Sequence, residues 1–166
     1  MPGKKNTERR LALTASAEEG PYYKTGSPER TNIIEPGAAG SKLIVEGRVL
    51  DRNGRPLAHA WLDFWHADGN GVYDNAGYNL RGHQYTDKDG RYRLETVRPY
   101  QYLFRSPHVH VKVRAGESSP TLTTQLYFPG EKRNETDPIF NKLTVMDVVD
   151  TKEGQKAVFD FVVENG

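Results

Sequence analysis

Apolar and polar side chains alternate along several short stretches of the chain from residue 41 onward. Residues 91–97 (RYRLETV) show this clearly, because Tyr92, Leu94 and Thr96 share one face and charged residues occupy the other. A period of two is the spacing of a β-strand that buries one face. Comparable patterns predict strands at 41–50, 83–86, 108–113, 121–128, 143–149 and 156–163.

Residues 57–66 (LAHAWLDFWH) are more densely apolar, which predicts a central, largely buried strand. Turn signals separate the predicted strands, and Asn53-Gly54 favours a tight hairpin between 41–50 and 57–66. One helical turn is predicted within 135–142, and the sequence shows no long amphipathic helix. Short strands at regular spacing predict an all-β fold, an antiparallel β-sandwich with long loops and little helix.

Length and charge narrow the class of protein. The 166 residues indicate one domain, which we place at 19–166 after a flexible, polar segment at 1–18. Lys and Arg number 23 and Asp and Glu 22, so the net charge is +1 and neither nucleic acid nor an anionic membrane is expected as a partner. No apolar run approaches the roughly 20 residues of a membrane-spanning helix.

The chain contains no cysteine, which excludes disulfides, thiolate metal sites and cysteine nucleophiles. Its first 20 residues lack the long apolar stretch of a secretory signal. Both features predict a cytoplasmic protein, although removal of a signal upstream of residue 1 would leave the same sequence.

The motif HVH at 108–110 places two imidazoles on one face of a predicted strand, with Val109 and Val111 facing the core. Two such imidazoles can bind one metal ion. Taken alone, the motif is more typical of solvated histidines on an exposed strand face. Of the other histidines, we interpret His59 as solvated and His66 and His83 as either polar lining or ligands.

Two of the nine tyrosines lie beside turns from which they could reach the face of His108 and His110: Tyr73 and Tyr102. A tyrosine after a turn more often packs at a rim than binds a metal. Together, however, two phenolates and two neutral imidazoles would form a doubly negative site, and hard anionic oxygen suits a hard, highly charged ion. The set therefore points to Fe(III) rather than Zn(II) or Cu(II), and to the binding of an aromatic diol.

The chain resembles the intradiol ring-cleavage dioxygenases, the family of catechol, hydroxyquinol and protocatechuate dioxygenases. The likeness extends from about Glu19 to Phe140 and consists of an ordered set of segments. These are EGPYY (19–23), GRVLDRNGRPLAHAWLDFWHADGNGVYDN (47–75), NLRGHQYTDKDGRYRLETVRP (79–99), RSPHVHVKV (105–113) and LTTQLYFPGE (122–131). No single segment is decisive, whereas the ordered set is highly specific.

The resemblance implies a mononuclear, non-haem Fe(III) site whose ligands are Tyr73, Tyr102, His108 and His110. It also implies Arg105 and Gln125 as active-site residues, and it places Pro21 and Tyr22 where the family has substrate-pocket residues. Two alternatives stay open from the residues themselves. Arg105 could instead form a salt bridge with a strand carboxylate, and Gln125 could be a polar filler of its strand.

The chain also departs from the family pattern. The segment between Tyr102 and His108 is short, Pro107 stands where alanine is common, and Tyr100-Gln101 replaces small residues. These differences predict a more open pocket. We find no helical N-terminal dimerisation region, so the resemblance leaves open whether the protein forms a homo-oligomer.

The reaction that the resemblance implies is cleavage of a catechol-type diol by O2. Both oxygen atoms enter the product, a cis,cis-muconate-type dicarboxylic acid. One tyrosinate is expected to leave the iron and accept a substrate proton, a role that we assign to Tyr73 although the sequence does not distinguish it from Tyr102. Arg105 is expected to stabilise negative charge on the substrate, and Gln125 to donate a hydrogen bond near its oxygens.

Two rival interpretations remain. The strand and turn patterns at 47–65 and 86–99 also fit a transthyretin-like β-sandwich, which is a binding module without a catalytic metal. A zinc hydrolase that uses His66, His83, His108 and His110 is a third interpretation, but the sequence offers no obvious carboxylate as its general base.

Overall fold

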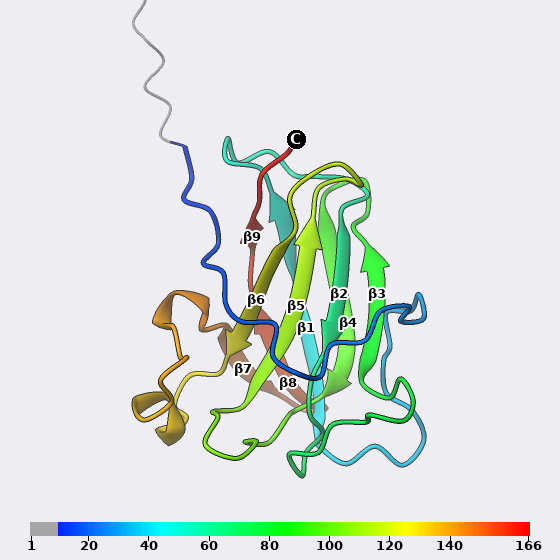
Figure 1. Cartoon of the computed structure of the whole chain (residues 1–166), viewed down its shortest axis with the longest axis vertical. Coiled ribbons are helices and arrows are strands. Elements are labelled where there is room, and N and C mark those ends of the chain that lie inside the picture. The colour runs from blue at the N-terminus through cyan, green and yellow to red at the C-terminus, as the bar shows by residue number, and fades with distance from the viewer. Residues whose placement is uncertain (1–9) are drawn as a thin grey trace, which may run out of the picture.

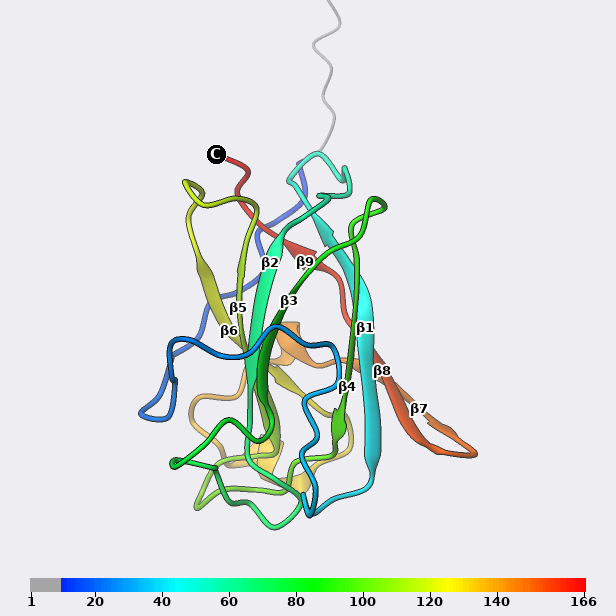
Figure 2. The ribbon, with the colours of Figure 1, turned by 90° about the vertical axis from the view of Figure 1, so that its right-hand side faces the viewer.

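The structure is a computed structural model that describes residues 10–166, and these residues form a sandwich of two β-sheets (Figures 1 and 2). The strands are β1 (Lys42–Leu50), β2 (Trp61–Trp65), β3 (Arg81–Tyr85), β4 (Arg91–Val97), β5 (His108–Arg114), β6 (Leu122–Tyr127), β7 (Asp147–Thr151), β8 (Gly154–Val158) and β9 (Phe161–Val162).

The two sheets differ in their strand directions. One has the order β3-β2-β5-β6 and is antiparallel throughout. The other has the order β4-β1-β8-β7, with β9 also paired to β1. Because β1 runs parallel to β8 and β9, the second sheet is mixed. The predicted all-β sandwich is confirmed, with these two parallel pairs as a refinement.

The core lies between the sheets and follows the alternation seen in the sequence. On β5, Val109, Val111 and Val113 are fully buried among core residues, as predicted. On β4, Tyr92 and Leu94 face the core while Arg91 and Arg93 are exposed. Burial of these apolar surfaces drives the pairing of the two sheets. It also leaves His108 and His110 on the outer face of the β3-β2-β5-β6 sheet.

The hairpin predicted at Asn53-Gly54 is confirmed only locally: Leu50 bridges Pro56, and the Leu57 N–H donates to the Val49 carbonyl group, but the long strands on either side do not pair. A turn does form there, because Gly54 has φ +80° and the Asp51 carboxylate accepts hydrogen bonds from the backbone N–H groups of Asn53 and Arg55. However, β1 pairs with β4, β8 and β9, whereas β2 pairs with β3 and β5. The turn therefore carries the chain from one sheet to the other.

The helical turn predicted within 135–142 is displaced. Short 3-10 helices lie at Lys132–Glu135 (η1) and Lys142–Thr144 (η2), at either end of that stretch. Between them the Asp137 carboxylate accepts from the Ile139 N–H, a local bond that competes with a helical turn. Within residues 10–166, no helix has the length and apolar character needed to cross a membrane.

Residues 10–18 run along the sandwich before the first strand, and backbone N–H groups of Leu11, Thr14 and Ala17 donate to carbonyl groups of the domain. The flexibility that we predicted for 1–18 stays a prediction, and residues 1–9 lie outside the described part of the chain. Residues 17–30, here called the strap, then cross the outer face of the β3-β2-β5-β6 sheet (Figure 1).

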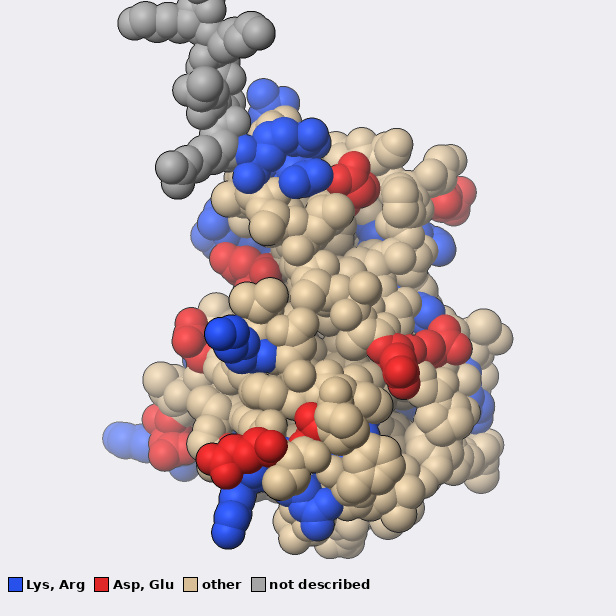
Figure 3. All heavy atoms as spheres, turned by 60° about the vertical axis from the view of Figure 1, so that its left-hand side comes forward, with Lys and Arg blue, Asp and Glu red and all other residues tan. Residues whose placement is uncertain are grey.

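The visible surface carries charges of both signs. Lys and Arg atoms gather toward the upper end of the face in Figure 3, and below it they are interspersed with Asp and Glu atoms. This mixture agrees with the net charge of +1.

Candidate functional site

Polar and aromatic side chains form a row across the outer face of the β3-β2-β5-β6 sheet. In register, Trp65 of β2 lies opposite Arg81 of β3 and His110 of β5, and His110 lies opposite Gln125 of β6. All four side chains are at most 3% exposed. Outward-facing residues are normally solvated, so a buried polar row indicates that something covers it.

Three predicted ligand atoms meet in this row. The Tyr73 hydroxyl lies 3.0 Å from Nε2 of His110 and 3.5 Å from Nε2 of His108, and the two Nε2 atoms are 3.0 Å apart. These side chains come from β5 and from the loop between β2 and β3. The structure thus brings Tyr73, His108 and His110 together as the sequence analysis expected.

The two imidazoles are held neutral. Burial lowers the pKa of His108 to about 4, with the Arg105 cation also lowering it. Burial also places the pKa of His110 well below its ordinary value, and the neighbouring His108 adds to that effect. His108 Nδ1 lies 2.6 Å from the Ser106 carbonyl oxygen, which only accepts, so Nδ1 carries the proton and Nε2 presents its lone pair to the cluster.

Tyr102 comes from the loop between β4 and β5 and lies edge-on to Tyr73, with ring centroids 5.4 Å apart. The two tyrosine loops pack against each other, because the Tyr100 N–H donates to the Asp68 carbonyl at 3.0 Å. Gly71 permits this approach, since a Cβ there would lie 2.3 Å from the Gln101 carbonyl oxygen. Glycine at this position therefore allows Tyr73 and Tyr102 to share one site.

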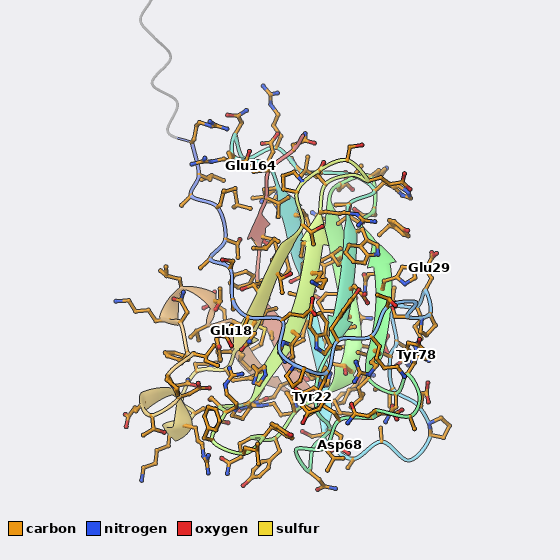
Figure 4. All side chains as sticks on the ribbon, viewed as in Figure 1. Glu18, Tyr22, Glu29, Asp68, Tyr78 and Glu164 are labelled. Carbon is orange, nitrogen blue, oxygen red and sulfur yellow. The ribbon has the colours of Figure 1, made fainter. Side chains whose placement is uncertain are left out.

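The strap supplies a third tyrosine. The ring of Tyr22 stacks on Tyr73 with centroids 4.4 Å apart, and its hydroxyl forms a hydrogen bond with the Tyr102 hydroxyl. Figure 4 shows Tyr22 near the lower ends of the strands, between Glu18 on one side and Glu29 on the other. Pro21 is exposed on the same segment. Tyr22 therefore contacts two predicted ligands, and Pro21 lies beside it in the chain.

Arg105 and Gln125 belong to one buried network. The Arg105 guanidinium donates to the Asp137 carboxylate at 2.9 Å and to the side-chain oxygen of Gln125. It also donates to the Tyr127 hydroxyl at 3.1 Å, and that hydroxyl donates to Gln125. These contacts bear on the two alternatives that the sequence left open. Arg105 does form a salt bridge, but its partner Asp137 lies in a loop and not on a strand. Gln125 is a buried residue that takes part in this hydrogen-bond network.

Burial would favour the neutral acid in Asp137. Backbone N–H groups of Ser106 and Ile139, together with Arg105, outweigh this and hold the Asp137 pKa below its ordinary value. The carboxylate is therefore ionised at neutral pH and fixes the guanidinium on its Nε side. The rest of the guanidinium remains directed toward Gln125 and Tyr127.

The donor set fits a metal ion of the predicted kind. The Nε2 atoms of His108 and His110 lie 3.0 Å apart, close enough for both to bind one ion at the usual metal–nitrogen distance of about 2.1 Å. Burial raises the pKa of the Tyr73 hydroxyl, so a strong Lewis acid is needed to make it a phenolate at neutral pH. Two imidazoles with phenolic oxygens suit Fe(III) better than softer ions.

The remaining histidines lie apart from this cluster. His66 is buried in the sandwich, where its ring nitrogens lie 2.6 Å from the Thr96 hydroxyl and from the Ala67 carbonyl. His83 hydrogen-bonds Ser27, and His59 stacks on Tyr85. Within residues 10–166, no three His, Cys, Asp or Glu side chains are grouped to hold a metal. The four-histidine zinc arrangement is therefore wrong.

The sequence analysis missed three residues that shape the site. Trp65 stacks on His110 with ring centroids 4.7 Å apart and an interplanar angle of 6°. Its position could have been found, because Trp65 alternates with the core residues of its strand. Asp137 and Arg81 reach the site from distant loop and strand positions, and no local pattern marks them.

Comparisons with known proteins identify the family of the chain. Residues 18–164 match the family model Dioxygenase_C, described as dioxygenase. The chlorocatechol 1,2-dioxygenase of Pseudomonas putida is 31% identical over 94% of this chain and 70% of its own length. The hydroxyquinol 1,2-dioxygenase of Rhizobium sp. (strain MTP-10005) is 31% identical over 81% of this chain and 54% of its own length. The chain thus spans only part of these relatives.

A solved structure with a similar fold is the dioxygenase domain of a dioxygenase–carbohydrate-binding protein fusion from Streptomyces sp. SirexAA-E. It has a TM-score of 0.89 and 44% identity, and the match covers 93% of this chain and all of that domain. The matched range includes Tyr73, Tyr102, His108 and His110. The chain therefore belongs to the intradiol ring-cleavage dioxygenase family.

Proposed function

We propose that this protein binds Fe(III) at Tyr73, Tyr102, His108 and His110 and cleaves a catechol-type diol with O2 to a cis,cis-muconate-type dicarboxylic acid. The observation that carries the proposal is the buried cluster of Tyr73, His108 and His110, whose donor atoms lie 3.0–3.5 Å apart beside Tyr102. The relatives that are catechol-type dioxygenases support the substrate class. The transthyretin-like alternative is not favoured, because a binding module has no need of this cluster.

A ferric ion held by Tyr73, Tyr102, His108 and His110 would supply a Lewis acid that lowers the pKa of the diol and makes its ring carbon reactive toward O2. The chain itself must then accept the protons that the diol releases. We assign one of them to the Tyr102 phenolic oxygen instead of to Tyr73. Tyr102 is only half-buried and lies on a surface loop, whereas Tyr73 is 7% exposed and packed under Tyr22.

Arg105 supplies fixed positive charge beside the site. Asp137 and Gln125 hold its planar guanidinium from two sides, so little reorganisation is needed when negative charge develops on the substrate. Trp65 keeps the His110 ring in one orientation by stacking on it. These contacts prepare the site before the substrate arrives.

A visible spectrum of the protein reconstituted with ferric iron tests the proposal. We expect a tyrosinate-to-iron absorption band that shifts to longer wavelength when catechol is added without O2. Subsequent admission of O2 should consume one O2 per catechol and release the muconate. A protein that stays colourless after ferric reconstitution would contradict the proposal and favour the β-sandwich binding module.

A further inference from the structure

The middle of the strap has no backbone-to-backbone hydrogen bond to the sheet that it crosses, although side chains of the sheet donate to two of its carbonyl groups, Arg81 to Tyr22 and Gln125 to Glu18. Its ends are tied, because the Ala17 N–H donates to the Thr123 carbonyl and the His83 N–H donates to the Pro28 carbonyl. Between them, no backbone-to-backbone hydrogen bond involves residues 18–27 of the described chain. Side chains must therefore set the height and register of this segment above the sheet.

Asp63 provides two of these side-chain attachments. It lies on the outward face of β2 and is 3% exposed. Its two carboxylate oxygens accept from the Tyr23 hydroxyl and from the Ser27 hydroxyl, each at 2.8 Å. One buried side chain thus holds two points of the strap, four residues apart. A buried carboxylate without such donors would be strongly destabilising, so the bonds and the burial depend on each other.

Neighbouring contacts keep the Tyr23 ring in place over the sheet. The ring packs on Trp65 with centroids 4.7 Å apart, and the Lys112 ammonium lies 4.8 Å from its centroid. Lys112 also pairs with Glu19 of the strap at 2.6 Å. The Asp63 attachment therefore adjoins Trp65, the same residue that stacks on His110.

The attached residues flank the part of the strap that covers the site. Tyr22, next to Tyr23 in the chain, stacks on Tyr73 and hydrogen-bonds Tyr102. Gly20 passes directly above His110, since a Cβ on Gly20 would lie 3.6 Å from His110 Cε1. Tyr23 thus adjoins groups in contact with three predicted ligands, and its attachment to Asp63 acts together with the Arg81 guanidinium, which donates to the Tyr22 carbonyl.

We propose that Asp63 is a positioning residue, which acts through Tyr23 and Ser27 to hold Gly20–Tyr22 against the tyrosines and histidines of the site. This inference rests on the proposed function of that site. It assigns a task to a side chain that touches neither the predicted ligands nor the substrate position. The competing explanation is that Asp63 only stabilises the fold.

The first test is limited proteolysis of the metal-free protein by trypsin, far below the melting temperature. The variants are Tyr23→Phe, Ser27→Ala and the double variant, and the control is Tyr92→Phe. Tyr92 is a matched control, because its buried hydroxyl donates to the Phe159 carbonyl at 2.7 Å in the other sheet. We expect trypsin to cut after Lys24, within the strap, about tenfold faster in the double variant and no faster in Tyr92→Phe. An unchanged rate of cleavage after Lys24 in the double variant would overturn the proposal.

The second test separates positioning from stability. In ferric protein at temperatures equally far below each melting point, the Tyr23→Phe variant should shift the tyrosinate-to-iron band and raise KM about tenfold. Tyr92→Phe should change neither quantity. A strap that is cut faster, with an unmoved band and an unchanged KM, would show that Asp63 only stabilises the fold. Absence of the band and of turnover in the unmodified protein would instead contradict the proposed function.

Discussion

The outer faces of the two sheets arise from the same alternation of inward and outward side chains, but they differ in how far those outward side chains are exposed. On β1 and β4 the outward residues stay partly exposed and form ion pairs, across strands between Arg93 and Glu46 and along β4 between Arg93 and Glu95. On β2 and β5 the outward residues Asp63, Trp65 and His110 are at most 3% exposed. The strap accounts for much of the difference, because it crosses the β3-β2-β5-β6 sheet (Figure 1), and Tyr73 from the loop after β2 packs between Tyr22 of the strap and His110.

This contrast shows where to look for chemistry in a β-sandwich. The solvated face can satisfy its charged groups with water and weak surface ion pairs. The covered face must satisfy every polar group with protein partners or a bound ion. Buried, neutral imidazoles that face a tyrosine hydroxyl have little structural value without such an ion, so their position marks the functional face.

The largest effect should follow removal of a ligand from the covered face. Tyr102→Phe deletes one phenolate, and we expect loss of the visible band and at least a roughly hundredfold fall in kcat. Arg93→Ala on the solvated face is the control and should leave both unchanged. Retained colour and turnover in Tyr102→Phe would mean that the ligand assignment is wrong.

A smaller loss is expected when Arg105 keeps its charge but not its shape. Arg105→Lys cannot contact Asp137 and Gln125 together as a planar guanidinium does, so kcat should fall about tenfold to a hundredfold. Arg98→Lys, which changes an arginine paired with Glu131 away from the ligands, is the comparison. Equal kinetics in the two variants would remove Arg105 from the active site.

The next effect concerns stability as a function of pH in the metal-free protein. Burial lowers the pKa of His66 from 6.5 to about 4. The unfolded chain therefore binds a proton first, and His66 weakens the fold progressively as pH falls from about 6.5 to 4. Above pH 6.5 His66 does not lower the free energy of unfolding. By pH 4 its protonation in the unfolded chain lowers that free energy by an amount on the order of 3 kcal/mol.

Urea denaturation from pH 7.5 to 4.0 measures this loss. The pH dependence should be smaller in His66→Gln, while His59→Gln, which changes an exposed histidine, should follow the unmodified protein. Identical pH slopes for the unmodified protein and His66→Gln would show that His66 is not buried in its neutral form.

The smallest effect should come from the solvated face. Glu46→Gln weakens ion pairs with Arg93 and Lys156, whose side chains are 55% and 45% exposed. We expect less than about 0.5 kcal/mol of lost stability and unchanged kcat. A loss above 2 kcal/mol in chemical denaturation would mean that this face is not simply solvated.

Much of the strand pattern was predictable, because side-chain alternation is local. It placed Val109 and Val111 in the core and His108 and His110 on the opposite face. Family resemblance then selected Tyr73, which the structure places against both histidines. The partner strands were less predictable: Asn53-Gly54 does make a turn, but pairing depends on which apolar faces can be buried together across the whole chain.

The sequence by itself determined the fold class, the outward face of HVH and the residue types that suit ferric iron, since each depends on short-range spacing or on an ordered set of motifs. Only the tertiary structure decided that Asp137 holds Arg105 and that Asp63 holds the strap, across separations of 32 and 36–40 residues. Such contacts form only after the sheets have paired and loops have closed. Once these polar groups are buried on the covered face, leaving one without a hydrogen-bond partner would cost stability. No local sequence pattern indicates which partner each group will have.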